Sequence, residues 1–209
     1  MRNILLLTGI VAVFLTACSS GSEKLIVYTN NGATIDEAAK VITIKDTFGH
    51  NEKNITFSGG DKTALKVKML SGEQSIDIAG AGYYIVNVKA RDTIIGGFQK
   101  YSTPEEANRV MTQEELAHNI DSLKQMIVGA NTNAANKTFF IPPYTAAKIT
   151  DNEDAFIVGP YHRMTSIEKT GNKDPEVYRF FSIKEVRETI GKLEKLTGAK
   201  PAEEEEKKK

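Results

Sequence analysis

Residues 63–89 read TALKVKMLSGEQSIDIAGAGYYIVNVK, and this stretch decides the fold class. Apolar and polar residues alternate in three runs, which turn-forming residues separate at 71–72 and 80–82. Because the side chains of a strand point alternately to its two faces, the pattern predicts short strands, each with one apolar and one solvent-facing side. In the last run this alternation assigns Asn87 and Lys89 to the solvent-facing side.

The same signals extend over residues 24–101, so we expect an antiparallel, immunoglobulin-like β-sandwich there, with about seven short strands. A helical linker is expected at 102–130, because the segments 103–106 (TPEE) and 112–115 (TQEE) both have the sequence of a capped helix start. Four apolar residues then recur at helical spacing and predict a buried stripe: Leu116, Ile120, Leu123 and Ile127.

Residues 131–198 are predicted to form an α+β region with a small second β unit and a C-terminal helix. Short strands are expected at 138–141, 145–150, 155–158, 163–169 and 177–181. Ser182 with Glu185 predicts the start of the final helix, and the neighbours Phe180 and Phe181 should face opposite sides of a strand that is buried on both faces. The charged tail 199–209 is expected to be disordered. The predicted fold class is therefore α+β and rich in strand.

An export signal is predicted at the N-terminus. Arg2 precedes an apolar run at 4–14, and small residues end at Ala17, which is the arrangement of a signal peptide over 1–17. A membrane-spanning helix needs roughly 20 apolar residues, so this run is too short to remain as a transmembrane anchor.

The sequence Leu-Thr-Ala-Cys at 15–18 resembles the lipobox of bacterial lipoproteins. The resemblance covers residues 1–18 only. It implies cleavage between Ala17 and Cys18 and acylation of Cys18, with palmitate among the acyl chains, followed by a short tether over 18–23. Ser19 and Ser20, rather than an acidic pair, favour the outer membrane in such proteins; the periplasmic face and the cell surface both stay open.

Charge and cysteine content exclude several classes of partner. The chain has 27 Lys and Arg against 27 Asp and Glu, with no basic stripe, which argues against nucleic acid as a ligand. Cys18 is the only cysteine, so neither a disulfide nor a thiolate metal site is expected. The expected partners are the lipid bilayer, through acylated Cys18, and another envelope protein.

No catalytic motif, metal site or cofactor is predicted. The three histidines, at 50, 118 and 162, lack the spacing that presents two imidazoles to a metal, and His118 should face solvent. The segment 166–171 contains S-x-x-K and K-T-G, but the two motifs share Lys169, which cannot occupy both positions of a penicillin-binding site.

Aromatic residues gather in the second half of the chain, near prolines. Tyr144, Tyr161 and His162 lie beside Pro142-Pro143 and Pro160, where a groove would accept an extended peptide, and they are the candidates for an interaction surface. Packing in the core is the competing interpretation for the aromatic residues as a group.

Two hypotheses for function follow. The first is a non-enzymatic envelope lipoprotein that presents an interaction surface as an accessory or scaffold protein. The alternative is an envelope hydrolase acting on cell-wall or polysaccharide material, with Asp151, Glu153, Asp154 and His162 as the candidate acid, base or ligand residues.

Overall fold

The computed structural model describes residues 21–46, 48–58, 62–100, 109–130, 132–164 and 174–197. The predicted signal peptide, Cys18, the helix start at 103–106 and the tail at 199–209 lie outside these residues, as does most of the strand expected at 163–169. The described elements are β1 (Ser22–Thr29), β2 (Thr34–Asp36), β3 (Val41–Thr43), β4 (Asn51–Ser58), β5 (Thr63–Met69), β6 (Gly72–Ile78), β7 (Gly82–Asn87), β8 (Ile94–Gln99), α2 (Gln113–Ile127), the 3-10 turn η1 (Ala134–Asn136), β9 (Thr138–Ile141), β10 (Thr145–Thr150), β11 (Phe156–Val158), β12 (Val177–Ser182) and α3 (Ile183–Thr197).

The strands form three four-stranded sheets, which we name A, B and C. Sheet A has the order β10-β7-β1-β4, sheet B the order β2-β3-β5-β6, and sheet C the order β11-β12-β8-β9. Each sheet contains one parallel pair: β1 with β7, β3 with β5, and β11 with β12. The expectation of a purely antiparallel sandwich over 24–101 is therefore wrong on strand direction. Alternation along a strand determines which face is apolar, but not which strand lies beside it.

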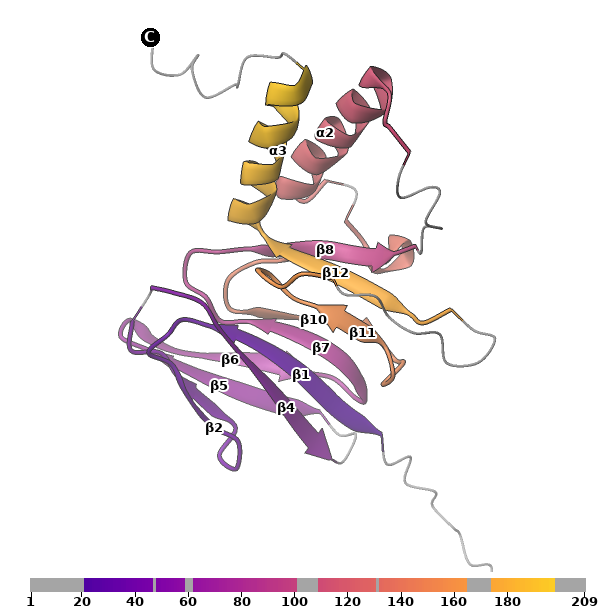
Figure 1. Cartoon of the computed structure of the whole chain (residues 1–209). Helices are drawn as coiled ribbons and strands as arrows, with labels where there is room; N and C mark the ends of the chain where they lie inside the picture. Colours follow the sequence, from indigo (N-terminus) through magenta and orange to yellow (C-terminus); the bar gives the residue numbers. More distant parts are fainter. Residues whose placement is uncertain are drawn as a thin grey trace, which may run out of the picture.

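The sheets and the helices stack in four layers, in the order sheet B, sheet A, sheet C and helices (Figure 1). One apolar cluster lies between sheets A and B, a second between sheets A and C, and a third between sheet C and the two helices. Sheet A is consequently covered on both faces. The chain is α+β and rich in strand, as its sequence predicted.

Burial of both faces of sheet A corrects one sequence prediction. Asn87 and Lys89 were expected to face solvent, but only 0% and 6% of their surface is exposed. Alternating polarity normally indicates one wet face, whereas here Asn87 ends β7 in the middle layer and Lys89 follows it in a connection beside Tyr161. Both residues have protein partners instead of water, as the site described below shows.

Strands from both halves of the chain share sheets. β8, from the part expected to form the N-terminal sandwich, pairs with β9 and β12, while β10, from the second half, pairs with β7. β1 begins at Ser22, inside the segment 18–23 expected to be a tether.

Both helices begin as the sequence predicted. Thr112 and Glu115 form a capping box at α2, and Ser182 and Glu185 make the equivalent pair of hydrogen bonds at α3. Phe180 lies in the cluster between sheets A and C, and Phe181 packs against the helices, so the prediction of opposite faces is confirmed. No helix among the residues described has both the length and the apolar character needed to cross a bilayer.

The direction of β1 separates two ends of the layered body. Ser22, where β1 begins, pairs with Ser58, and Thr29, where it finishes, pairs with Asn51. Eight strand residues span about 26 Å. We call the end beyond Thr29 the loop end; it comprises the connections at 30–33, 44–46, 48–50, 70–71, 88–93 and 142–144.

Candidate functional site

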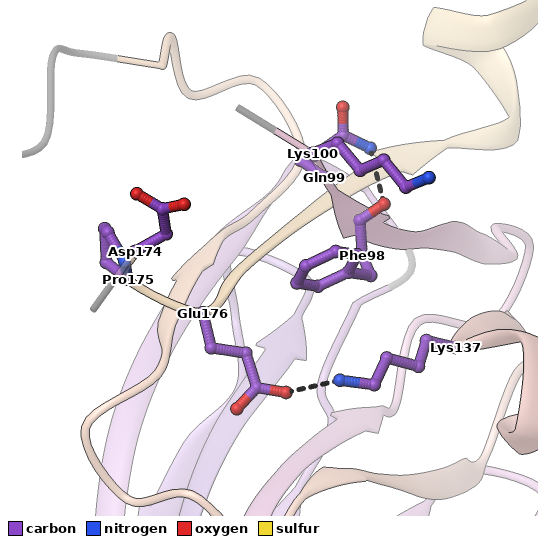
Figure 2. A pocket seen from close by; sticks show the side chains of 7 residues that line it. All are labelled: Phe98, Gln99, Lys100, Lys137, Asp174, Pro175 and Glu176. Atoms are coloured by element: carbon purple, nitrogen blue, oxygen red, sulfur yellow. Dashed lines mark hydrogen bonds and ion pairs between the residues drawn. The ribbon is translucent and has the colours of Figure 1, made fainter. Parts of the chain in front are cut away.

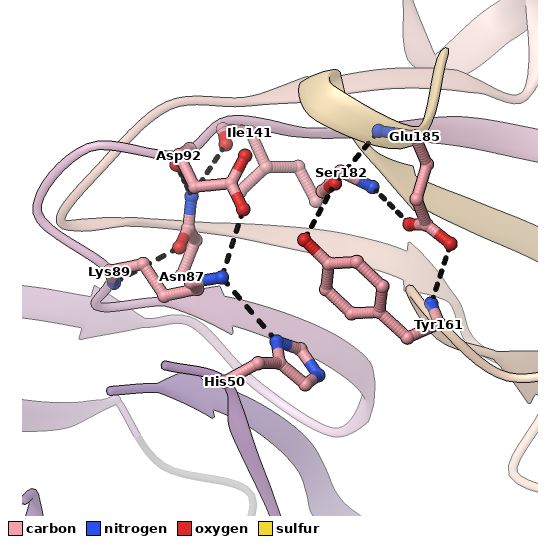
Figure 3. A network of polar contacts seen from close by, with 8 residues as sticks. All are labelled: His50, Asn87, Lys89, Asp92, Ile141, Tyr161, Ser182 and Glu185. Carbon is pink, nitrogen blue, oxygen red and sulfur yellow. Dashed lines mark hydrogen bonds and ion pairs between the residues drawn. The ribbon is translucent and has the colours of Figure 1, made fainter. Parts of the chain in front are cut away.

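The segment 159–162, which follows β11, packs against the loop end of sheet A. Tyr161 has a φ of 65°, in the left-handed region that residues with a side chain rarely adopt. Two hydrogen bonds hold it there: its backbone N–H donates to Glu185 Oε1 at 2.8 Å, and its hydroxyl donates to Ser182 Oγ at 3.0 Å (Figure 3). Because Ser182 and Glu185 also cap α3, the turn and the helix start depend on the same two side chains.

Tyr161 covers His50. The two rings meet edge to face with their centroids 4.7 Å apart, and the Lys89 ammonium lies 5.7 Å from the centre of the tyrosine ring. Lys89 is paired with Asp92 at 2.9 Å, and its nitrogen lies 3.5 Å from His50 Nδ1. Asn87 ties this group to the sheets, because its amide donates to the carbonyls of Asp92 and Ile141 (Figure 3).

His50 is held in its neutral form. Burial, and then the neighbouring Lys89 ammonium, lower the pKa of His50 from 6.5 to about 4. An ammonium group can only donate hydrogen bonds, so the nitrogen that faces Lys89 is the acceptor and Nε2 carries the ring hydrogen. Nε2 itself is buried and has no hydrogen-bond partner among the described residues.

Two more buried oxygens that lack a hydrogen-bond partner among the described residues lie beside Gly159, in the same segment as Tyr161. They are the hydroxyl of Tyr28, a fully buried residue whose ring stacks on His50, and Oε2 of Glu52. A Cβ on Gly159 would come within 3.0 Å of both oxygens, so both flank the same point of the turn. His162 Nε2 lies 3.2 Å from Glu52 Oε2, close enough for an ion pair when the histidine is protonated. Burial and the Glu52 carboxylate both raise the pKa of Tyr28.

Tyr144 lies at a different place on the loop end. It also has a left-handed backbone, with a φ of 58°, and it contributes to a hollow of about 310 Å³ between the ends of sheets A and B. The lining consists of Ile44, Lys45, Asp46, Met69, Leu70, Ser71, Ala90, Arg91 and Tyr144. Of the three sequence candidates, the neighbours Tyr161 and His162 both lie in the segment 159–162, whereas Tyr144 lies at the hollow.

A second cavity, of about 420 Å³, lies where β8 ends and β12 begins (Figure 2). The carboxylate of Glu176 is its most perturbed group. Burial raises the pKa of Glu176, but hydrogen bonds from the Tyr178 hydroxyl, Lys137 and Asn152 together outweigh burial and lower that pKa to about 2. Thr150 donates to the same carboxylate, and a carboxylate with four protein partners holds strands and loops together, so we assign this group a structural role.

The candidate residues for hydrolysis do not converge. Glu153 accepts hydrogen bonds from Ser22 at the start of β1, whereas His162 contacts Glu52, which pairs with Tyr28. Six residues along β1 separate these positions, or about 20 Å. Asp151 is exposed and paired with Lys148, and Asp154 is also exposed. Among the described residues, no group of three or more histidine, cysteine or acidic side chains is arranged to hold a metal ion.

Sequence reasoning missed most of the site. Tyr28, Glu52 and Lys89 each read as an ordinary strand residue, and their proximity depends on strand order. One signal was present: His50 and Glu52 are two residues apart, which places both on the same face of an extended chain. A second signal was Leu70, a large apolar residue in a turn, where small and polar residues are usual. In the structure 92% of its surface is exposed, and it lines the hollow beside Tyr144.

Comparison with known proteins adds no identity. The chain matches no protein family, no curated protein and no solved structure.

Proposed function

We propose that this chain is an exported lipoprotein, anchored in the cell envelope through acylated Cys18, that acts as a non-enzymatic interaction or accessory protein. In this proposal the anchor lies in the outer membrane, and the loop end is the surface offered to another envelope protein. The lipobox resemblance supports the anchor. The arrangement of β1 supports the choice of surface.

The observation that carries the proposal is the separation of the chain's entry from three exposed apolar residues at the loop end. Cys18 precedes Ser22 by four residues, which extend over at most about 14 Å. β1 then runs its full length to the loop end, where 76% of Phe48, 92% of Leu70 and 50% of Tyr161 are exposed. A lipid at Cys18 would leave this end directed away from the membrane. Large apolar side chains exposed at the same end of the sheets support the choice of this end as a contact surface.

The alternative of an envelope hydrolase finds less support. Its four candidate residues are divided between the start of β1 and the loop end, so they do not flank one substrate. General acid–base catalysis requires both groups within hydrogen-bond reach of the reacting atoms. We therefore do not propose hydrolysis.

The anchor is tested by metabolic labelling with an alkyne analogue of palmitate. We expect the native chain to carry the label and the Cys18→Ala variant to lack it. An unlabelled native chain that is nevertheless cleaved and exported would contradict lipidation while leaving the interaction surface to be tested separately.

The surface is tested by crosslinking in intact cells. A photo-reactive phenylalanine analogue replaces Leu70 at the loop end or, as the matched control, Leu196 on α3, where 70% of another leucine is exposed. We expect position 70 to capture one envelope protein reproducibly, identified by mass spectrometry, and position 196 not to capture it. Equal products from both positions, or products formed only with lipid, would contradict the proposed surface.

A further inference from the structure

The hollow beside Tyr144 combines an apolar floor with unpaired positive charge. Ile44 is buried in the cluster between sheets A and B, and Met69 and Tyr144 pack against that cluster from the outside. Leu70 stands at the rim, at the tip of the connection between β5 and β6, with 92% of its surface exposed. A leucine in this position buries little apolar area and so adds little to the stability of the fold, and its side chain is accessible to a ligand.

Two cations flank the hollow. Lys45 and Arg91 line it, and both are exposed. Neither makes a hydrogen bond or an ion pair with any residue that the structure describes. The neighbouring Lys89, by contrast, is already paired with Asp92. The hollow thus has positive side chains that are available to a ligand.

The one acidic residue in the lining is occupied by the loop itself. Asp46 Oδ1 accepts a hydrogen bond from the backbone N–H of Phe48, and the Asp46 carbonyl accepts one from the Asn30 amide. Its Oδ2 lies against Gly32, where a Cβ would come closer than 3.0 Å. Asp46 therefore shapes the loop, and against its one formal negative charge the lining has two positive charges, on Lys45 and Arg91.

From this geometry we propose that the hollow binds an acidic segment of a partner protein that inserts one large apolar side chain between carboxylates. A volume of about 310 Å³ is near the lower limit for ligand pockets and accommodates a single large side chain. Carboxylates on either side of that side chain meet Lys45 and Arg91, and Arg91 is able to bind one of them through two parallel hydrogen bonds. This inference rests on the proposed function, since it gives the chemistry of the partner at the same loop end.

A membrane surface is the competing occupant, because apolar residues beside cations also bind anionic lipid. The anchor argues against it. The chain enters β1 at Ser22, four residues after Cys18 and at the end opposite the hollow, so in the proposed anchoring the hollow lies about a strand length from the chain's own bilayer. The partner protein is therefore the occupant to which we commit.

The test is a titration of the full chain carrying Cys18→Ala with synthetic peptides, followed by NMR of the methyl groups of Ile44, Met69 and Leu70. The probe is Ac-Asp-Asp-Phe-Asp-Asp-NH₂. One control peptide replaces Phe by Ala, and another replaces every Asp by Asn. We expect saturable shifts with the first peptide, a Kd in the millimolar range, and binding at least about tenfold weaker for either control, a difference of about 1.4 kcal/mol.

Variants separate the two parts of the hollow. The double variant Lys45→Gln/Arg91→Gln should reduce binding of the acidic peptide to the level of its Asn control, and Leu70→Asn should reduce it toward the Ala control. Lys192→Gln/Lys195→Gln is the matched control: it removes two exposed cations from α3 and should leave binding unchanged.

Three results would overturn the proposal: no shift at the hollow, equal binding of all three peptides, or shifts produced only by vesicles of phosphatidylethanolamine and phosphatidylglycerol. The proposed function fails on different evidence. If a crosslinker at position 70 captures a defined envelope protein while the acidic peptide does not bind, the surface is right and the partner chemistry is wrong. If the peptide binds but positions 70 and 196 give the same products in cells, the proposed function fails.

Discussion

The burial of His50 predicts a specific loss of stability in mild acid. In the unfolded chain the imidazole takes up a proton near its ordinary pKa of 6.5, whereas in the folded chain its pKa is about 4. Between these values the unfolded state binds more protons, so the free energy of unfolding falls as the pH is lowered from about 6.5 to about 4. Above about pH 6.5 the full contribution of neutral His50 to the free energy of unfolding is present.

The magnitude follows from the shift. A pKa of 6.5 unfolded and about 4 folded corresponds to about 2 kcal/mol of lost stability between pH 7 and pH 5. Because His50 is only part-buried, solvent screening reduces this to about 1 kcal/mol. His50→Gln removes the titrating group, so the variant should lose about 1 kcal/mol less than the native chain over the same interval.

The assay is urea unfolding at pH 7 and at pH 5, with the comparison made on the change between the two pH values rather than on absolute stability. His118→Gln is the matched control, since His118 is exposed on α2, and it should retain the native pH dependence. Glu176 does not interfere, because its lowered pKa removes stability only as the pH falls from about 4.5 to about 2. An unchanged pH dependence in His50→Gln would refute the inference that His50 is held neutral.

Three further substitutions test the packing. Gly159→Ala places a Cβ within 3.0 Å of the Tyr28 hydroxyl and should lower the free energy of unfolding by about 1–3 kcal/mol in urea denaturation; a neutral effect would mean that the turn does not press on β1. Ser182→Ala removes the α3 cap and the acceptor for Tyr161, so thermal unfolding should show a loss of about 1–2 kcal/mol, larger than that of Thr112→Ala at the more exposed cap of α2. Glu23→Met replaces a carboxylate that is 1% exposed and lacks a hydrogen-bond partner among the described residues, so the free energy of unfolding in urea should rise by about 1–3 kcal/mol. A destabilised variant would show that the carboxylate has a hydrogen-bond partner in solution.

Local structure was predictable wherever it depends on neighbours in the sequence. The capping pairs at 112–115 and 182–185 satisfy backbone groups within one helical turn, so their residue types alone identify the helix starts. β9 and β10 were expected at the residues where they occur, because alternation and turn residues bound them. The apolar stripe of α2 follows from helical spacing in the same way.

The arrangement of strands was not predictable, and the site depends on it. Nothing local in β7 reveals that sheets cover both of its sides, so Asn87 and Lys89 read as solvent-facing. His50, Tyr28 and Tyr161 meet because β4 pairs with β1 and because the turn after β11 folds over them. Tyr28 and His50 are 22 positions apart in the chain and His50 and Tyr161 are 111 apart, and residue patterns do not encode contacts at such separations.

The central position of β1 also has a consequence for how the chain acquires its structure. β1 is the first strand in the sequence, yet in sheet A it pairs with β4 and, in parallel, with β7, and its two faces are buried by sheets B and C. Contacts between distant parts of a chain form slowly, and parallel pairs are among the slowest. During synthesis, the apolar run Leu25–Tyr28 is able to pair with β4 first, but its other edge stays unpaired until residues 82–87 of β7 arrive. This interval is when the chain is most prone to aggregate, so a holding chaperone would have its largest effect on yield here.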